Sequence, residues 1–191
     1  TGADNVASND GPDVLLGDTG RIVATAGIRR TAIADEAPGG ADLLDAGAGS
    51  EWILGGAAGD TILNPSGRSS ILGDAGEIRA DAQGRVIALL SRSPSIGGND
   101  TIVAYAGTDW IVAGAGADSV DSGDGDDVVL GDVGRLRLED SRPNAVVAGG
   151  SPGGADDIDG GDGDDWILGG AAGDRIVKAA GTSVILGDGG A

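Results

Sequence analysis

Acidic residues recur at intervals of nine along this chain of 191 residues, and this spacing is the clearest sign of chemistry in the sequence. The candidate ligands at the repeating position are Asp4, Asp13, Asp42, Asp60, Asp100, Asp109, Asp118, Asp127, Asp156, Asp165 and Asp174. Histidine and cysteine are absent, so zinc and copper would lack their preferred ligands. Carboxylate and backbone carbonyl oxygens suit hard divalent cations instead. The pattern therefore predicts a row of cation sites.

Composition narrows the classes of function. The chain carries 31 acidic and 12 basic residues, a net charge of −19, which argues against a nucleic-acid partner and favours multivalent cations. No apolar run is long enough to cross a bilayer, so no membrane insertion is expected. No nucleophile stands beside a base, and the repeat itself explains the paired acids, so we expect no enzymatic activity. The chain begins and ends partway through a repeat, which favours a piece of a longer protein.

A branched aliphatic residue follows two places after the repeating position in all fourteen units, as Ile102 follows Asp100. With 39 glycines and no phenylalanine the chain cannot fill an ordinary globular core, but a solenoid needs only one thin apolar layer per coil. The best-formed unit is GlyGlyAspGlyAspAspTrpIleLeu at 160–168. This pattern, GGxGxDxUx with U a large apolar residue, resembles the RTX, or haemolysin-type calcium-binding, repeat over roughly three quarters of the chain.

The resemblance implies an all-β fold, a parallel β-roll or β-solenoid in which two nonapeptides make one turn and calcium ions lie between stacked loops. Alternate units then share a side of the roll. The first edge carries Asp4, Asp42, Asp60, Asp100, Asp118, Asp156 and Asp174. The second edge carries Asp13, Glu51, Ser69, Asp109, Asp127, Asp165 and Ser183, so two of its units lack a carboxylate. Several Ca²⁺ ions are the expected cofactors.

A longer repeat lies over the nonapeptides, because LeuGlyAsp recurs at 16–18, 72–74, 130–132 and 186–188. We expect a single domain, 1–191, with nonapeptide blocks at 1–18, 37–74, 95–132 and 151–188 and inserts at 19–38, 75–96 and 133–152. Each insert alternates like a strand, meets a turn signal and resumes with apolar residues, which predicts three β-hairpins. The turns are expected at Ala26-Gly27, Gln83-Gly84 and Arg142-Pro143-Asn144. Two coils advance about 9.6 Å, the width of one hairpin, so the hairpins should stack into an additional sheet.

The outward-facing residues indicate where that sheet rests. The strands that follow the second edge carry Trp52, Trp110 and Trp166 outward, and so large an apolar face rarely stays wet. We expect the hairpins to cover this face and bury the tryptophans; the alternative is an exposed tryptophan ladder that stacks on sugars or contacts a protein. Nine of the twelve basic residues lie in the inserts, where they either keep exposed strands soluble or pair with acids of a neighbouring coil or another molecule.

The individual sites are not expected to be equal. Those at Asp109, Asp127 and Asp165 should be the best formed, with Asp118 also in a well-matched loop. The loops 55–60 and 169–174 move the second glycine by one place, which could reshape or empty their sites, and Arg68 could itself replace an ion. The aspartates of LeuGlyAsp are either additional ligands or turn-stabilising hydrogen-bond acceptors. They are Asp18, Asp74, Asp132 and Asp188.

The leading functional hypothesis is a calcium-binding structural module of a large secreted or cell-surface bacterial protein, such as an adhesin, a surface-layer or a filament component. The resemblance implies an extracellular location and type I secretion, with folding on calcium binding. Open coil ends could support homotypic end-to-end or lateral assembly. The alternatives are a non-catalytic module attached to a secreted enzyme, and a carbohydrate- or ice-binding surface; exposure of the three tryptophans would favour the latter.

Overall fold

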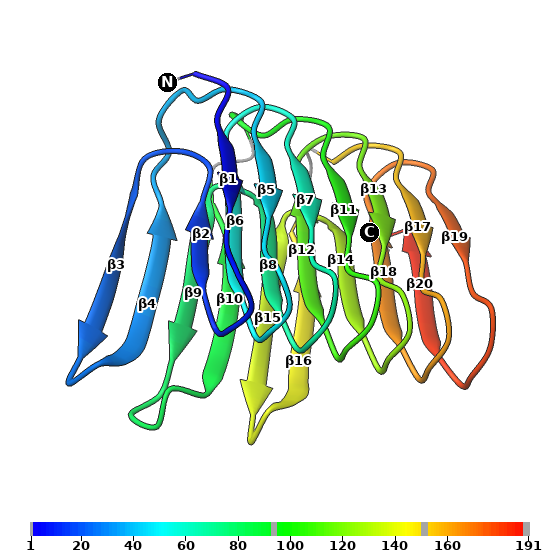
Figure 1. Ribbon diagram of the computed structural model, residues 1–191. Helices are drawn as coiled ribbons and strands as arrows, with labels where there is room; N and C mark the ends of the chain where they lie inside the picture. Colours follow the sequence, from blue (N-terminus) through cyan, green and yellow to red (C-terminus); the bar gives the residue numbers. More distant parts are fainter. Residues whose placement is uncertain (1, 93–94, 150–152, 189–191) are drawn as a thin grey trace.

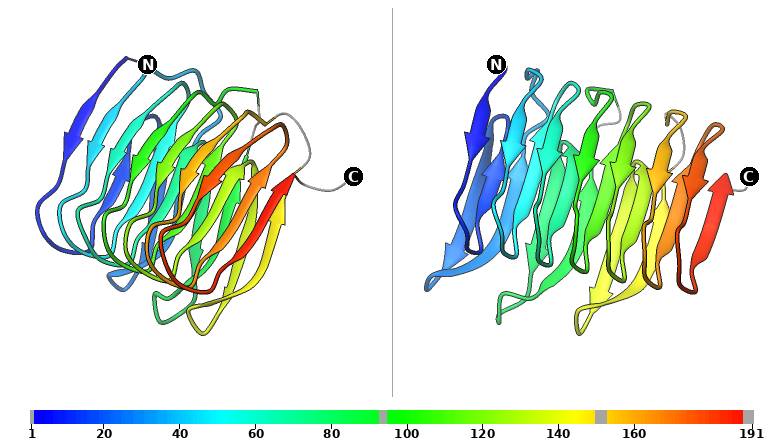
Figure 2. Two further views of the ribbon diagram at one scale, coloured as in Figure 1. Left: turned by 90° about the vertical axis from the view of Figure 1, so that its right-hand side faces the viewer. Right: turned by 45° about the vertical axis from the view of Figure 1, so that its right-hand side comes forward.

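The computed structural model describes residues 2–92, 95–149 and 153–188, and every regular element in them is a β-strand. The chain winds into a flattened roll with a parallel sheet on each side, and a third, antiparallel sheet lies along the roll (Figure 1). Figure 2 shows the coils stacked in chain order from the first residues to the last, with the three hairpins on one side. The predicted β-roll with an additional hairpin sheet is confirmed.

The parallel sheets take their order directly from the sequence, because strands alternate between them. One sheet, here called the odd sheet, consists of β1 (Asn5–Ala7), β5 (Leu43–Asp45), β7 (Thr61–Leu63), β11 (Thr101–Val103), β13 (Ser119–Asp121), β17 (Asp157–Asp159) and β19 (Arg175–Val177). The other, the even sheet, consists of β2 (Val14–Leu16), β6 (Trp52–Gly56), β8 (Ser70–Asp74), β12 (Trp110–Gly114), β14 (Val128–Asp132), β18 (Trp166–Gly170) and β20 (Val184–Asp188).

The aliphatic residue of each nonapeptide fixes the register. Ile102 of β11 lies opposite Ile62 of β7 and Val120 of β13, so like positions pair with like positions. These side chains point into the roll and form one continuous core. It contains Leu15, Leu44, Ile53, Ile62, Ile71, Ile102, Ile111, Val120, Val129, Ile158 and Ile167. A shift by one residue would turn the whole aliphatic row outward, so this core locks the pairing of the coils.

The three inserts form hairpins that pair with one another in the order β16-β15-β10-β9-β4-β3. Their strands are β3 (Gly20–Thr25), β4 (Ile28–Ala34), β9 (Gly76–Ala80), β10 (Val86–Ser91), β15 (Gly134–Glu139) and β16 (Arg142–Ala148). The turn expected at Arg142-Pro143-Asn144 is wrong: the chain reverses at Asp140 and Ser141, which take positive φ of 49° and 60°. Pro143 lies inside β16, and it is tolerated there because β16 is an edge strand that pairs only with β15.

A second core fills the space between the hairpin sheet and the even sheet. Ile78, Leu89 and Leu136 of the hairpins are fully buried against Trp52 and Trp110, each of which is 3% exposed. The prediction that the hairpins bury the tryptophans is therefore confirmed for these two. It is wrong for Trp166, which is 39% exposed, because the last described hairpin strand contacts mainly β14, and of β18 only Leu168 packs against the hairpin core.

The outer face of the odd sheet is solvated, as expected from Asn5, Thr101, Ser119, Asp121 and Asp157, all of which are exposed. In the described part of the chain there is no helix of the length and apolarity that would span a membrane. The structure thus has one solvated face that carries most of its polar residues, one covered apolar face and two edges of glycine-rich loops.

Candidate metal centre

The first edge forms a ladder of aspartates that runs through every coil. In each coil, the carboxylate Oδ1 accepts a hydrogen bond from the backbone N–H of the aspartate one coil earlier, at 2.7 to 3.1 Å. Asp100 Oδ1, for example, accepts from Asp60 N at 2.7 Å, and Asp118 Oδ1 accepts from Asp100 N at 2.8 Å. The aliphatic core sets this spacing, since it holds the loops in the same register as the strands. One oxygen of each carboxylate is therefore committed to joining two coils.

The other oxygen of each carboxylate accepts no hydrogen bond. The buried oxygens without a hydrogen bond are Oδ2 of Asp42, Asp60, Asp100, Asp118, Asp156 and Asp174 on the first edge, and Glu51 Oε1 with Oδ2 of Asp109, Asp127 and Asp165 on the second. A buried charged oxygen without a partner is costly, and a row of them requires an explanation. A row of bound cations would supply the missing partners.

Glycine brings carbonyl oxygens to the same places on the first edge. A Cβ placed on Gly73 would lie 2.2 Å from Asp100 Oδ2 and 2.3 Å from the carbonyl oxygen of Ala113, and one on Gly55 would lie 2.4 Å from Asp60 Oδ2 and 2.1 Å from Gly73 O. Carboxylate and carbonyl oxygens thus converge where only glycine leaves room. These are the donor types that calcium prefers.

The second edge achieves the same convergence by another route. Six of the seven glycines two places before the repeating position of this edge take positive φ, as at Gly67 (108°), Gly107 (153°) and Gly125 (146°). A Cβ on Gly107 would lie 1.8 Å from Gly67 O, and one on Gly125 would lie 1.4 Å from Gly107 O. Each loop therefore turns a carbonyl against the next loop, beside Asp109 and Asp127, whose buried Oδ2 atoms have no partner.

The electrostatics of both edges oppose ionisation. Burial raises the pKa of Asp100 to about 9, and repulsion from Asp74, Asp118 and Asp60 adds to this effect. Burial likewise raises the pKa of Asp109 to about 8. It raises the pKa to about 7 for Asp60, Asp118, Asp127 and Asp156. A bound divalent cation reverses this logic, because it makes the ionised form the favoured one.

No three acidic side chains gather around a single point in the residues that the structure describes. The acids are distributed at one per loop, so each ion would be completed by backbone carbonyls. This arrangement fits calcium, which takes six to eight oxygens and accepts carbonyls readily. Nine of the eleven predicted ligands, all except Asp4 and Asp13, place their carboxylates in ladders along the two edges and not in clusters.

The ends and the irregular units depart from this scheme. Asp4 is exposed and Asp13 half-buried, and neither carboxylate accepts a hydrogen bond of the ladder, since they stand at its beginning. On the second edge the hydroxyls of Ser69 and Ser183 take over the accepting role, from Glu51 N at 3.3 Å and from Asp165 N at 3.0 Å. They continue the ladder without adding charge.

A basic side chain accompanies each serine. Burial raises the pKa of Asp109, and the charge of Arg68 opposes part of this rise. The Arg68 guanidinium lies 5.6 Å from the centre of the Trp110 ring. Lys178 Nζ lies 3.0 Å from Asp165 Oδ2, within ion-pair distance but outside hydrogen-bond geometry. Protein cations thus stand beside the ladder where the loop lacks a carboxylate.

The loops with a displaced glycine keep the local backbone shape. Ala58 and Ala172 occupy the glycine position and still take positive φ, 75° and 79°. Asp60 and Asp174 at the ends of these loops therefore keep the ladder hydrogen bonds and an unpartnered Oδ2. The backbone is strained at the two alanines, because a residue with a Cβ is disfavoured at positive φ.

The side chains of the LeuGlyAsp aspartates accept hydrogen bonds from loops that are distant in the sequence. They do not accept them from their own turn. Asp74 accepts from Gly98 N at 3.2 Å and from Ala115 N at 2.5 Å, which ties the return of the second hairpin to the following coil. Asp132 accepts in the same way from Gly154 N and Ala171 N, and Asp18 from Ala57 N. The side chain of Asp188 lies outside the described residues.

One set of contacts was not anticipated from the sequence. The acids one place before the repeating position also join adjacent coils, because Asp126 Oδ1 accepts from Asp164 N at 3.0 Å and Asp164 Oδ1 from Thr182 N at 2.7 Å. The hairpin arginines also form their ion pairs within the hairpin sheet: Arg79 and Arg92 pair with Glu77, and Arg85 pairs with Asp81 and Asp140.

The chain matches the RTX calcium-binding nonapeptide repeat, in four copies, over residues 39–62, 96–134 and 153–185, which together make up half of its length. No curated protein and no solved structure matches it. Repeats of this kind bind several Ca²⁺ ions per array, in agreement with the oxygen-only ligands of the two edges. The chain belongs to the RTX calcium-binding nonapeptide repeat family.

Proposed function

We propose that residues 1–191 form one calcium-stapled structural module of a larger secreted or cell-surface protein. The repeating-position acids of both edges serve as the metal ligands, with Asp4 and Asp13 completing them at the first coil. Each ion binds a free carboxylate oxygen and carbonyls of adjacent loops, so that it joins two coils. The observation that carries this proposal is the row of buried carboxylate oxygens without hydrogen-bond partners.

The role of such a module is mechanical and not catalytic. Without calcium the row of buried acids opposes folding, and the glycine-rich chain has little apolar surface with which to offset its backbone entropy. Calcium supplies the missing counter-charge, so binding and folding are one process. This logic suits a protein that leaves a calcium-poor cytosol unfolded by type I secretion and becomes rigid outside the cell.

Assembly through the coil ends is part of the proposal. At the last coil, Val184, Ile185 and Leu186 are 50%, 45% and 49% exposed, and β20 has one unpaired edge. An apolar parallel edge of this kind can be covered by a further coil, of the same protein or of a second copy, and the second case is the proposed homotypic stacking. The alternative of a tryptophan ladder for sugars has little support, since Trp52 and Trp110 are buried.

A calcium titration tests the proposed function. Circular dichroism should show a cooperative gain of β-structure as calcium rises, together with a change in tryptophan emission as Trp52 and Trp110 become buried. Magnesium, which demands octahedral geometry and keeps its water, should act much more weakly at the same concentration. A chain that is equally folded with calcium and with an excess of chelator would refute the proposal.

A further inference from the structure

The side chain of Lys178 ends among oxygens of the kind that the second edge offers to an ion. Its Nζ lies 3.0 Å from Asp165 Oδ2 and donates to the carbonyl oxygens of Gly161, at 2.6 Å, and of Ala180. The first two oxygens belong to the loop 160–165, and the third belongs to the loop 178–183, which pairs with it one coil further along. The amine therefore lies between two stacked loops, where the proposed function places an ion.

The surroundings of the amine match the chemistry of an ammonium group. An ammonium has three N–H donors and no acceptor, and all three oxygens around Nζ are acceptors. Two of them accept hydrogen bonds, and the carboxylate oxygen lies at ion-pair distance. The Asp165 side chain is 0% exposed and the Lys178 side chain 13%, so both charges are largely removed from water. A buried carboxylate is costly unless a positive charge pairs with it, and Lys178 supplies that charge from within the chain.

Two features of the sequence direct the lysine to this place. Lys178 is the first residue of its loop, and that position faces the interior of the roll, since Ala104 at the corresponding place is fully buried in the aliphatic core. The preceding loop of this edge begins with Gly160. A Cβ on this glycine would lie 2.5 Å from Ile167 Cδ1 and 3.3 Å from both Asp165 Oδ2 and Lys178 Cδ. Glycine therefore leaves room for the stem of the lysine.

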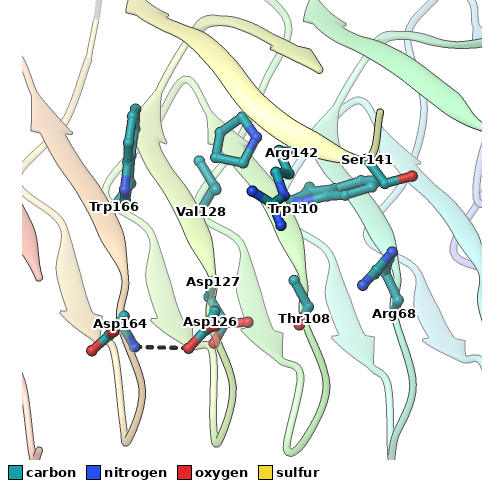
Figure 3. A pocket seen from close by; sticks show the side chains of 11 residues that line it. Arg68, Thr108, Trp110, Asp126, Asp127, Val128, Ser141, Arg142, Asp164 and Trp166 are labelled. Carbon is teal, nitrogen blue, oxygen red and sulfur yellow. Dashed lines mark hydrogen bonds between the residues drawn. The ribbon is translucent and has the colours of Figure 1, made fainter. Parts of the chain in front are cut away.

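Arg68, the basic residue of the other second-edge loop that ends in serine, is placed differently. It is the fifth residue of its loop and lies beside Trp110, in a pocket that Arg142 of β16 also lines (Figure 3). Among the described residues Arg68 forms no ion pair. The first residue of that loop is Asn64, which is fully buried but neutral. Arg68 therefore does not bridge two loops as Lys178 does.

We propose that the ammonium group of Lys178 occupies the cation position between the loops 160–165 and 178–183, so that no calcium ion binds there. The inference rests on the proposed function and narrows it at one acid, because Asp165 then pairs with lysine and not with a metal. An ammonium carries one charge and contacts three oxygens here, whereas calcium carries two charges and takes six to eight oxygens. This interface is therefore closed by a weaker cation, which is part of the chain itself.

The number and location of the calcium ions test the proposal. Crystals grown in calcium should show anomalous peaks at other acids of the ladders but none beside Asp165 Oδ2, and Lys178→Gly should add a peak there. Native mass spectrometry of the calcium-bound proteins should count one ion more in Lys178→Gly than in the wild type. A calcium peak beside Asp165 in the wild type, or the same number of bound ions in both proteins, would overturn the proposal. Absence of every ion from both proteins would instead refute the proposed function, and the inference with it.

Matched substitutions separate this effect from the mere loss or gain of a positive charge. Arg175→Gln removes an exposed cation that pairs with Asp157 on the odd sheet, and it should leave the number of ions unchanged. Ala104→Gly combined with Ser122→Lys rebuilds the glycine and the lysine in the loops 104–109 and 122–127, beside Asp109, and should remove one ion. Ala104→Gly alone should remove none. A folded double variant that keeps all its ions would show that a lysine at this position does not displace calcium, which contradicts the assignment.

Discussion

Each aspartate within the first-edge ladder uses its two carboxylate oxygens differently. In Asp100, Oδ1 accepts the Asp60 N–H, and Oδ2 is buried without a partner. The role of Oδ1 requires only a hydrogen-bond acceptor, and the side-chain oxygen of asparagine also provides one. The role of Oδ2 is to bind a cation, and this requires the charged carboxylate. A substitution that keeps one role and removes the other can therefore separate folding of the backbone from binding of the ion.

Asp100→Asn should have opposite effects with and without calcium. It keeps the acceptor for Asp60 but removes an anionic ligand, so the calcium concentration at half-folding should rise about tenfold. In chelator at about pH 8 the same change should increase the residual β-structure, because the mutant has no proton to take up on burial. Circular dichroism measures both effects, with the exposed Glu36→Gln as control. Destabilisation in both conditions would indicate a purely structural role.

The raised pKa values predict an unusual dependence on pH in the absence of calcium. The pKa is about 9 for Asp100, about 8 for Asp109 and about 7 for Asp60, against an ordinary value of 3.8. The folded state therefore binds protons more tightly than the unfolded chain, so this contribution to stability is present at low pH and is lost as pH rises through 7 to 9. In chelator, circular dichroism should therefore show more residual β-structure at about pH 5.5 than at about pH 8.5. With calcium this order should reverse, because protons compete with the ion for the carboxylates.

The strained alanines offer a test that does not involve a ligand. Ala58 takes a φ of 75°, where a Cβ is disfavoured, so Ala58→Gly should stabilise the calcium-bound fold by about 1 kcal/mol. Ala57, its neighbour, is buried and has no positive φ, so Ala57→Gly should destabilise it. Thermal unfolding of the two variants compares them directly, and equal loss in both would show that the turn at Ala58 is relaxed.

At the scale of elements, stability depends on the contact between the hairpin sheet and the even sheet. Ile22, Ile78 and Leu136 occupy the same place in the three hairpins, yet Ile22 is 50% exposed and the other two are fully buried. Leu136→Ala should therefore cost about 2–5 kcal/mol of the free energy of unfolding, and Ile22→Ala much less. Denaturation in saturating calcium measures both variants. If Leu136→Ala lost no more free energy of unfolding than Ile22→Ala, the hairpin sheet would contribute little to the fold.

The sequence predicts the repeating elements well and their exceptions poorly. The period of nine fixes the strands, the aliphatic core and the two rows of acids, because each coil meets the same neighbours. Trp166 was mispredicted since its environment depends on whether a hairpin lies over β18, which no local pattern encodes. The third turn was mispredicted because Pro143 is a strong turn signal that an edge strand tolerates. The long-range hydrogen bonds of Asp74 were missed for a similar reason, since their partners, Gly98 and Ala115, are brought near only by the winding of the chain.

At the scale of the whole molecule, the roll is a one-dimensional array in which each coil contacts only its neighbours. Such an array is as rigid as its weakest interface. The first edge joins every pair of coils through an aspartate, while the second edge substitutes hydroxyls at Ser69 and Ser183. We therefore expect the interfaces at these two serines to exchange their backbone amides with solvent first as calcium is withdrawn. Hydrogen exchange followed by mass spectrometry resolves this order, and uniform exchange along the chain would argue against it.

The most direct test of the account is the location of the ions. Crystals grown in calcium, with data that measure its anomalous scattering, should show peaks beside the unpartnered Oδ2 atoms of Asp60, Asp100 and Asp118, between loops of adjacent coils. Water alone at these positions, or calcium confined to the exposed acids of the odd sheet, would contradict the central claim that calcium joins the coils.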